Sequence, residues 1–327
     1  MYYARKKRRR EDESGADAAA KRVVAELLCE SHRIADIEAC TRKLSRLIDG
    51  GASSLTVIAD FDRTMTTALS TSAHGVVSRA LPESFQKTER ALFNKYYPIE
   101  KDLDMPLAEK IPLMREWYGA NHSAMVKERS LTKDKLRRAV AASAGGDFSL
   151  RPGVVEALDL LQGRGVAVQI FSAGLGDVIE AALACLYPSP VAATTRVVSN
   201  TMKWSPDGEL AGFSEPLIHM YNKSQENVGA PLANAILVGD SLGDVTMADG
   251  AKRGPDVALR VGFLNVPDPD DSAVAKYAKA FDIVVLNDAD PTFRVVQSVC
   301  AAVLATDDGA RAPNKKQRAP PPARAQA

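Results

Sequence analysis

A short apolar segment that ends in two carboxylates constrains this chain more than any other feature. Residues 55–59 are apolar or β-branched, as in a buried strand, and Asp60, Asp62 and Thr64 follow at alternate positions. In open α/β sheets, ligands bind beside the carboxyl ends of the strands. Because the backbone turns where a strand ends, both carboxylates can face one ligand. The segment therefore predicts a site in which one carboxylate attacks or holds a metal and the other acts as an acid and base.

The rest of the chain alternates between strand and helix patterns. This alternation predicts an α/β fold with a doubly wound, mainly parallel sheet. A helical region at 17–49 ends at Gly50 and Gly51, and 202–213 has the pattern of a hairpin. Further helices are predicted at 152–161 and 176–186, and further strands at 166–171, 196–199, 235–239, 256–262 and 283–286.

One long helical stretch interrupts this alternation early in the chain. Residues 66–150 are helical and polar with clustered aromatic residues, and we interpret them as a helical cap inserted over the strand ends. The α/β core then consists of 17–65 and 151–305. Both ends of the chain, 1–16 and 306–327, are rich in basic residues and poor in apolar ones, so we expect them to be disordered.

The near-neutral total charge hides a difference between the body and the ends. Residues 5–13 carry +3 and residues 311–327 carry +5, which leaves −7 for residues 14–310. A mildly acidic body is unlike a nucleic-acid-binding surface. Binding of RNA, or a nuclear address, is therefore expected only through the basic ends.

Chemically active side chains follow three of the predicted strands. Besides Asp60, these are Ser172 after the second strand and Asp240 after the third, with Lys223 shortly upstream. Parallel strands end at the same edge of a sheet, so these groups can share one crevice. Each residue alone could be a surface charge or an ordinary turn residue, but together they indicate phosphoryl transfer.

The types of these residues fit that chemistry. Asp60 and Asp240 can bind Mg²⁺ through oxygen, and a carboxylate can form an aspartyl-phosphate. Lys223 supplies positive charge for the phosphoryl oxygens and Ser172 a hydroxyl donor. Asp62 can protonate the leaving oxygen and later deprotonate the attacking water.

The order of these motifs resembles the haloacid dehalogenase superfamily. More narrowly, the chain resembles the cytosolic 5′-nucleotidase III (pyrimidine 5′-nucleotidase) family between about residues 35 and 300. The motifs that carry the resemblance are Asp-Phe-Asp-Arg-Thr at 60–64, Lys-Tyr-Tyr-Pro-Ile-Glu at 95–100, Glu-Trp-Tyr at 116–118, Phe-Ser-Ala-Gly-Leu-Gly-Asp at 171–177, His-Met-Tyr-Asn-Lys at 219–223 and Gly-Asp-Ser-Leu-Gly-Asp at 239–244.

The resemblance implies a role for each catalytic residue. Asp60 matches the nucleophile and Asp62 the acid and base. Asp60, the backbone carbonyl of Asp62, and Asp240 match the Mg²⁺ ligands, with Asp244 as a supporting carboxylate. An acid that interacts with the dipole of a helix N-terminus is the alternative interpretation of Asp244.

The resemblance also implies how the substrate is bound. Ser172, Ala173, Gly174 and Lys223 match contacts to the phosphate, and Glu100 matches the acid that recognises the exocyclic amino group of the base. Trp117 and Tyr118 match the aromatic side of the base pocket, although neighbouring helix positions face different ways, so we expect only one of them to meet the base. Two departures affect base preference: Asn121 stands where the family has a serine, and residues 68–78 differ, with His74 aligned to a histidine.

These interpretations predict a Mg²⁺-dependent enzyme that hydrolyses nucleoside 5′-monophosphates, with CMP and UMP as the expected substrates. Three alternatives remain open. They are the same chemistry on 7-methylguanosine monophosphate or another small phosphomonoester, phosphotransfer to a second nucleoside, and an RNA-associated protein that acts through its basic ends.

Composition bears on the location of the protein. The charged N-terminus is followed by no apolar stretch, and no run approaches the roughly 20 apolar residues of a membrane span. The four cysteines, Cys29, Cys40, Cys185 and Cys300, are far apart, as expected for reduced core residues. A soluble, cytoplasmic protein is therefore expected, with nuclear access through the basic N-terminus as an option; the sequence predicts no oligomeric state.

Overall fold

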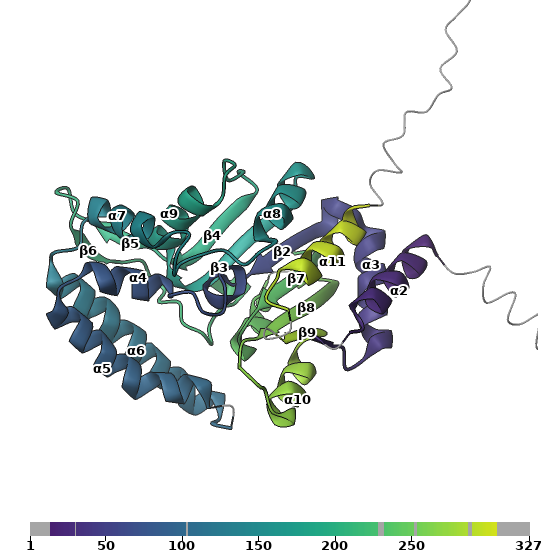
Figure 1. The fold of residues 1–327 in the computed structure, drawn as a ribbon, viewed down its shortest axis with the longest axis horizontal. Coiled ribbons are helices and arrows are strands. Elements are labelled where there is room, and N and C mark those ends of the chain that lie inside the picture. Colours follow the sequence, from purple (N-terminus) through teal and green to yellow (C-terminus); the bar gives the residue numbers. More distant parts are fainter. Residues whose placement is uncertain are drawn as a thin grey trace, which may run out of the picture.

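The computed structural model contains one seven-stranded sheet at its centre (Figure 1). It describes residues 14–29, 31–102, 104–227, 232–251, 254–286 and 290–305, so most of both predicted disordered ends lies outside the described residues. All neighbouring strands are parallel except β1, which pairs antiparallel with β9 at one edge. The order is β1 (His32–Arg33), β9 (Ile283–Leu286), β8 (Val257–Leu264), β7 (Asn234–Gly239), β2 (Leu55–Ala59), β3 (Ala167–Leu175) and β4 (Thr195–Asn200).

Strand β2 lies in the interior of the sheet, between β7 and β3, and is buried on both faces. Its residues alternate between two apolar clusters, with Val57 in one and Ile58 in the other, because successive side chains of a strand point to opposite faces. Ala59 at its end pairs with Ile170 of β3 and Val238 of β7. This register brings the carboxyl ends of the three strands to one edge of the sheet.

Helices cover the core on both sides of the sheet, which confirms the predicted doubly wound α/β fold. Apolar residues recur at helical spacing on the buried face of each helix. These helices are α2 (Gly15–Leu27), α3 (Ile37–Ser54), α8 (Val154–Gly163), α9 (Gly176–Leu186), α10 (Asp271–Ala280) and α11 (Arg294–Leu304).

The N-terminal helical region differs from the prediction in three ways. It consists of α2 and α3 with the short strand β1 between them, because His32 pairs with Val285 of β9, a partner far along the chain. Gly50 and Gly51 do not end α3, which continues to Ser54 across a local break where Gly51 has a φ of 62°. Helix α2 begins at Gly15 behind the N-cap Ser14, two residues before the expected start of the core.

The region of residues 66–150, which the sequence predicts to be a helical cap, lies on the left of Figure 1. It contains α4 (Ala73–Ala80), α5 (Glu83–Lys101), α6 (Leu107–Glu128) and α7 (Lys133–Ser143). The predicted hairpin at 202–213 is present as β5 (Met202–Trp204) and β6 (Leu210–Phe213), and it packs on these helices. Leu210 donates a backbone hydrogen bond of 3.0 Å to Leu131, so a segment outside 66–150 completes the cap.

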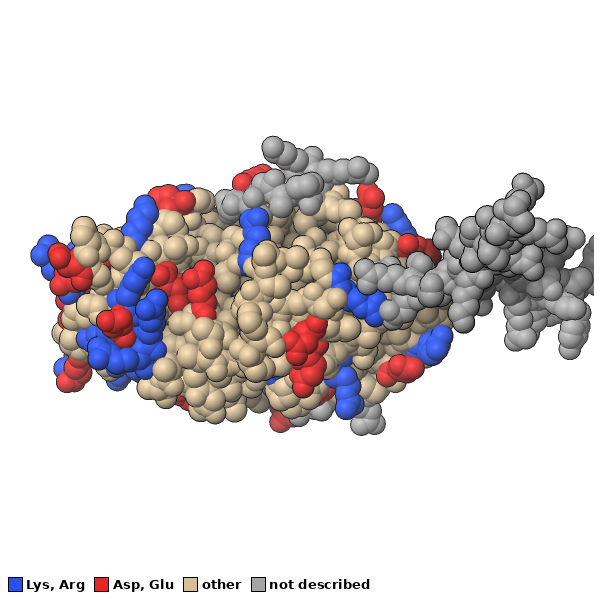
Figure 2. Space-filling model, turned by 90° about the horizontal axis from the view of Figure 1, so that it is seen from above, with Lys and Arg blue, Asp and Glu red and all other residues tan. Residues whose placement is uncertain are grey.

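The composition-based expectations have mixed outcomes. All four cysteines are free, but only Cys40 and Cys300 are buried, whereas Cys29 and Cys185 are exposed. Across the described residues, none of the helices combines the length and hydrophobicity needed to cross a membrane. Figure 2 shows acidic and basic side chains interspersed on a largely uncharged face, so that face presents no continuous basic surface.

Candidate active site

The chain turns sharply after β2, and buried polar side chains hold this turn. Arg63 adopts a left-handed conformation with a φ of 64°. The buried Arg151 donates hydrogen bonds to the carbonyl oxygens of Arg63 (2.8 Å) and Thr64 (3.0 Å). Asn265 donates a further hydrogen bond of 2.9 Å to the carbonyl of Arg63. The sequence predicts no role in the site for Arg151 or Asn265: Arg151 follows no strand, and Asn265, which directly follows β8, belongs to none of the quoted motifs.

Asp62 lies at the boundary between the core and the cap. One of its carboxylate oxygens accepts a hydrogen bond of 3.0 Å from the backbone N–H of Ala73, at the start of α4. The other oxygen faces Gly174, where an added Cβ would lie only 3.0 Å from it. Burial raises the pKa of Asp62 to about 6, although the Ala73 N–H opposes this shift. A carboxyl group with such a pKa can both give and take a proton near neutral pH.

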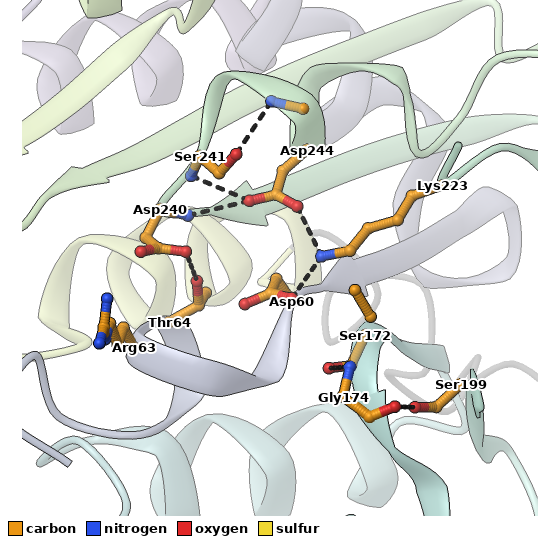
Figure 3. A network of polar contacts seen from close by, with 12 residues as sticks. Asp60, Arg63, Thr64, Ser172, Gly174, Ser199, Lys223, Asp240, Ser241 and Asp244 are labelled. Carbon is orange, nitrogen blue, oxygen red and sulfur yellow. Dashed lines mark hydrogen bonds and ion pairs between the residues drawn. The ribbon is translucent and has the colours of Figure 1, made fainter. Parts of the chain in front are cut away.

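Lys223 joins two buried carboxylates (Figure 3). Its ammonium group contacts an oxygen of Asp60 and lies 2.7 Å from an oxygen of Asp244, and its side chain is only 1% exposed. Burial alone would lower the pKa of Lys223, but Asp244 and Asp60 outweigh burial and raise it. Burial raises the pKa of Asp60, which Lys223 counteracts in part.

The acidic groups outnumber the positive charge available to them. Asp60, Asp240 and Asp244 each place one carboxylate oxygen within 4.8 Å of the others, and a single ammonium, that of Lys223, lies between two of them. A divalent cation would offset this excess, and carboxylate oxygens are the ligands that Mg²⁺ prefers. The donor set therefore fits a magnesium ion, and the acid cluster is a candidate metal site.

The three carboxylates are held differently. Both oxygens of Asp244 are engaged, one by Lys223 and the other by the backbone N–H groups of Asp240 (3.2 Å) and Ser241 (3.0 Å). Together with Ser241, Asp244 also forms a capping box on a short 3₁₀ helix, so both sequence interpretations of this acid apply. Asp240 and Asp60 line the cleft, whereas Asp244 lies behind Lys223 and supports it.

Residues 172–174 form the opposite wall of the site, in the stretch of β3 where the pairing with β4 shifts register. Ser172 accepts a hydrogen bond of 3.0 Å from the N–H of Gly174. Ser199 donates a 2.8 Å hydrogen bond to the carbonyl of Gly174, and Asn200 a 2.9 Å hydrogen bond to that of Ala173. Both donors come from β4, so the neighbouring strand fixes this stretch.

Asp60, Asp62, Ser172, Lys223 and Asp240 line one cleft between the core and the cap. Trp117 and Tyr118 both line the cleft, and the expectation that only one of them meets the base stays a prediction. Trp117 stacks on Tyr96 with ring centroids 5.9 Å apart, and Tyr118 meets His74 edge to face at 5.8 Å. The cap therefore presents an aromatic wall to this cleft.

Polar groups accompany the aromatic wall. Glu100 lines the cleft, and burial raises the pKa of its carboxyl group. Asn121 also lines it, and the buried Oδ1 of Asn121 has no hydrogen-bond partner among the described residues. A buried acceptor without a partner is costly, so this oxygen is available to a ligand donor.

The structure thus brings nearly all the predicted site residues to one cleft, with Asp244 just behind it. Those that line it are Asp60, Asp62, Glu100, Trp117, Tyr118, Asn121, Ser172, Ala173, Gly174, Lys223 and Asp240. Besides His74, seven further residues line the cleft for which the sequence predicts no role, namely Arg63, Ser72, Glu89, Phe93, Tyr97, Lys101 and Met220. Arg63, Tyr97 and Met220 belong to the quoted motifs, but nothing in those motifs marks them as lining the cleft.

A parallel sheet with this acid, serine and lysine set at its strand ends defines a hydrolase of the haloacid dehalogenase superfamily. Residues 63–304 match the family model "Pyrimidine 5′-nucleotidase (UMPH-1)". The chain belongs to this family, which confirms the resemblance in its sequence, and it is a 5′-nucleotidase.

Relatives and solved structures agree with this assignment. The chain is 35% identical to putative cytosolic 5′-nucleotidase 3 of Caenorhabditis elegans, over 81% of this chain and 73% of that protein. It is 33% identical to the 7-methylguanosine phosphate-specific 5′-nucleotidase of Gallus gallus, over 86% and 99% of the two chains. Its fold matches the crystal structure of cytosolic 5′-nucleotidase IIIB bound to cytidine with a TM-score of 0.75 at 27% identity, covering 86% of this chain and 96% of that one.

Proposed function

We propose that this 5′-nucleotidase hydrolyses nucleoside 5′-monophosphates with Mg²⁺ through an aspartyl-phosphate on Asp60. The observation that supports this most is the placement of Lys223 between Asp60 and Asp244, beside Asp240, at the polar end of a cleft whose other end is aromatic. A phosphate fits the first end and a base the second.

The proposed reaction has two steps. A carboxylate oxygen of Asp60 attacks phosphorus, and the bond between phosphorus and the 5′ oxygen breaks as Asp62 donates a proton to that oxygen. Water then attacks phosphorus while Asp62 takes its proton, and the bond to Asp60 breaks to release phosphate. The pKa of Asp62, about 6, suits both roles.

The surrounding residues stabilise charge on the phosphoryl group. Lys223 faces two of its oxygens in this proposal, and Ser172 and the backbone beside Gly174 supply hydrogen-bond donors. Asp60, Asp240 and the backbone carbonyl of Asp62 would hold Mg²⁺, which supplies positive charge for the transferring group. The cap limits access of water to this end of the cleft.

For the base, we propose a pyrimidine, with CMP and UMP as substrates. Trp117 and Tyr118 would stack on the ring, and Asn121 would offer its unpartnered Oδ1. Glu100 would accept from the exocyclic amino group of cytosine, a group that uracil lacks. The family description and the cytidine bound to cytosolic 5′-nucleotidase IIIB support this proposal.

7-Methylguanosine monophosphate is a second candidate, which the names of several relatives favour. Its base carries a positive charge, and cations bind well over aromatic rings beside carboxylates. The cleft offers Trp117 and two acids, Glu89 and Glu100, for such a base. The name of the Caenorhabditis elegans relative also supports action in the cytosol.

A phosphate-release assay with a magnesium titration tests these proposals. The panel contains CMP, UMP, 7-methylguanosine monophosphate, AMP and GMP, and a second nucleoside added as an acceptor measures phosphotransfer. Asp60→Asn should abolish turnover, whereas Asp49→Asn, at an exposed position on α3, should not change it. Full activity of Asp60→Asn would exclude the proposed mechanism.

A further inference from the structure

Helix α5 ends beside the core, and its last carbonyl groups lack partners within the helix. The carbonyl of Glu100 accepts hydrogen bonds from Lys110 Nζ (3.2 Å) and from the hydroxyl of Tyr221 (3.1 Å). The carbonyl of Asp102, just after the helix, accepts a second bond from Lys110. Two side chains from other segments therefore cap the C-terminus of α5.

Lys110 is unusual because it is a lysine that is only 3% exposed. It comes from α6 of the cap, and its ammonium lies 5.6 Å from the ring centroid and 3.4 Å from the hydroxyl of Tyr221. Burying an ammonium is costly unless its donors are bonded. Its partners here are the helix end and Tyr221, and a cation is favoured at a helix C-terminus.

Tyr221 belongs to the core, on the loop that leads to Lys223 two residues later. Its hydroxyl therefore joins the loop that carries the phosphate-binding lysine to the helix end that carries Glu100. A second contact across the same boundary, between Lys276 of α10 and Asp104, is 2.6 Å long but largely exposed. Exposed ion pairs contribute little, so the buried contacts of Tyr221 and Lys110 dominate here.

We propose that Lys110 and Tyr221 are positioning residues that hold Glu100 at the distance from the phosphate end that a nucleoside monophosphate requires. This inference rests on the proposed base-reading role of Glu100. Neither residue touches the reacting atoms in this proposal. They act by fixing the end of α5, and hence the separation between the two ends of the cleft.

The proposal predicts a substrate-dependent effect. Tyr221→Phe keeps the ring and removes one hydroxyl that bonds to Glu100. Loss of such a hydrogen bond corresponds to about a 3- to 10-fold drop in kcat/KM, mostly through KM, for the preferred nucleotide of the panel. For p-nitrophenyl phosphate, which has no base to read, the change should stay below about 2-fold. Lys110→Met should act in the same way, and Lys110→Arg should restore most of the selectivity because it keeps the charge.

The test measures kcat and KM for both substrates in each variant. Tyr187→Phe is a matched control, since this tyrosine bonds to Asp159 in the core and lies outside the cleft. Turnover of p-nitrophenyl phosphate also shows that the catalytic core has folded, and Tyr221→Phe remains informative if a Lys110 variant does not fold.

A double-mutant comparison separates positioning from a general structural role. If Tyr221 acts through Glu100, Tyr221→Phe should cost no further selectivity in a Glu100→Ala background. Three results would overturn the inference. They are losses of selectivity that add in the double mutant, equal losses of kcat/KM on the nucleotide and on p-nitrophenyl phosphate, and unchanged selectivity in Tyr221→Phe. If Glu100→Ala itself left base selectivity unchanged, the base-reading part of the proposed function would fail together with the inference. If Glu100→Ala loses base selectivity but Tyr221→Phe and Lys110→Met keep it, the positioning role of Tyr221 and Lys110 is overturned and the proposed function stands.

Discussion

Removal of the Lys223 ammonium tests the charge balance of the site directly. Lys223→Met keeps the length of the side chain but leaves two buried carboxylates, Asp60 and Asp244, without their counter-charge. These carboxylates are 7% and 0% exposed, so water cannot replace the lysine. Loss of one partner from a buried ion pair costs about 3–5 kcal/mol, and we expect the free energy of unfolding to fall by that amount at pH 7.5.

The dependence of this loss on pH gives a sharper result. Burial already raises the pKa of both Asp60 and Asp244, and without Lys223 these values must rise further. Protonation removes the unpaired charge, so the deficit of the variant relative to the wild type should shrink as the pH falls from 7.5 to 5. Magnesium should also reduce the deficit by supplying another counter-charge.

Urea denaturation of both proteins in EDTA, and again in Mg²⁺, measures these differences. Lys87→Met is the control, because Lys87 pairs with Glu83 on the surface of α5 with a 73% exposed side chain. We expect that variant to lose less than about 1 kcal/mol at every pH. The proposed charge balance would be wrong if Lys223→Met lost as little free energy of unfolding as the control, or if its loss grew toward pH 5.

Three further predictions concern catalysis and acid stability. Asp62→Asn should lower kcat by about 10²- to 10⁴-fold in the phosphate-release assay while Mg²⁺ binding persists, and an unchanged kcat would contradict its role. Gly174→Ala places a Cβ 3.0 Å from Asp62 and 3.1 Å from Ser172, so kcat should fall about 10-fold or more with little change in Tm. Gly212→Ala is the control and should leave kcat unchanged, because its Cβ meets no atom within 4 Å. Burial lowers the pKa of His122 to about 3, whereas a value of about 6.5 is expected in the unfolded chain. Below pH 6.5 the unfolded chain therefore binds a proton that the folded protein does not, so the contribution of the neutral His122 to stability is present above pH 6.5 and is lost as the pH falls. Between pH 7 and pH 5 the wild type should lose about 1–2 kcal/mol more than His122→Gln, and parallel stability curves would exclude this account.

Much of the fold could be predicted because the signals for it are local. The apolar run before Asp60 predicts the central strand, since a strand buried on both faces needs apolar residues at every position. The alternation of strands and helices predicts the parallel sheet, and the long helical interruption predicts the cap. Each of these patterns lies within one stretch of the chain.

The errors arose where partners far apart in sequence decide the local structure. Residues His32 and Arg33 form a strand only because β9 lies beside them. The hairpin at 202–213 was predicted, but its packing against Leu131 of the cap depends on the folded chain. Gly50 and Gly51 are compatible with a helix end, yet the helix resumes after the break at Gly51 and continues to Ser54.

The same division holds for the candidate site. Spacing within the chain suggested which residues carry the chemistry, namely Asp60, Asp62, Ser172, Lys223 and Asp240, because each follows a strand or belongs to a short motif. Arg151 and Lys110 gave no such signal, and although Asn265 follows β8 and Tyr221 lies in the motif at 219–223, the sequence predicts no role for either. Their importance comes from hydrogen bonds to backbone carbonyls of other segments, and no local pattern encodes such contacts.

Hydrophobic periodicity and short motifs are local properties, so the class of fold, the family and the residue types available for phosphoryl chemistry can be predicted from the chain alone. The position of Lys223 between Asp60 and Asp244, and the presence of Glu100 in the same cleft, follow only from the folded structure. These relations depend on strand register and on the packing of the cap, and both arise when distant segments bury their apolar faces against each other.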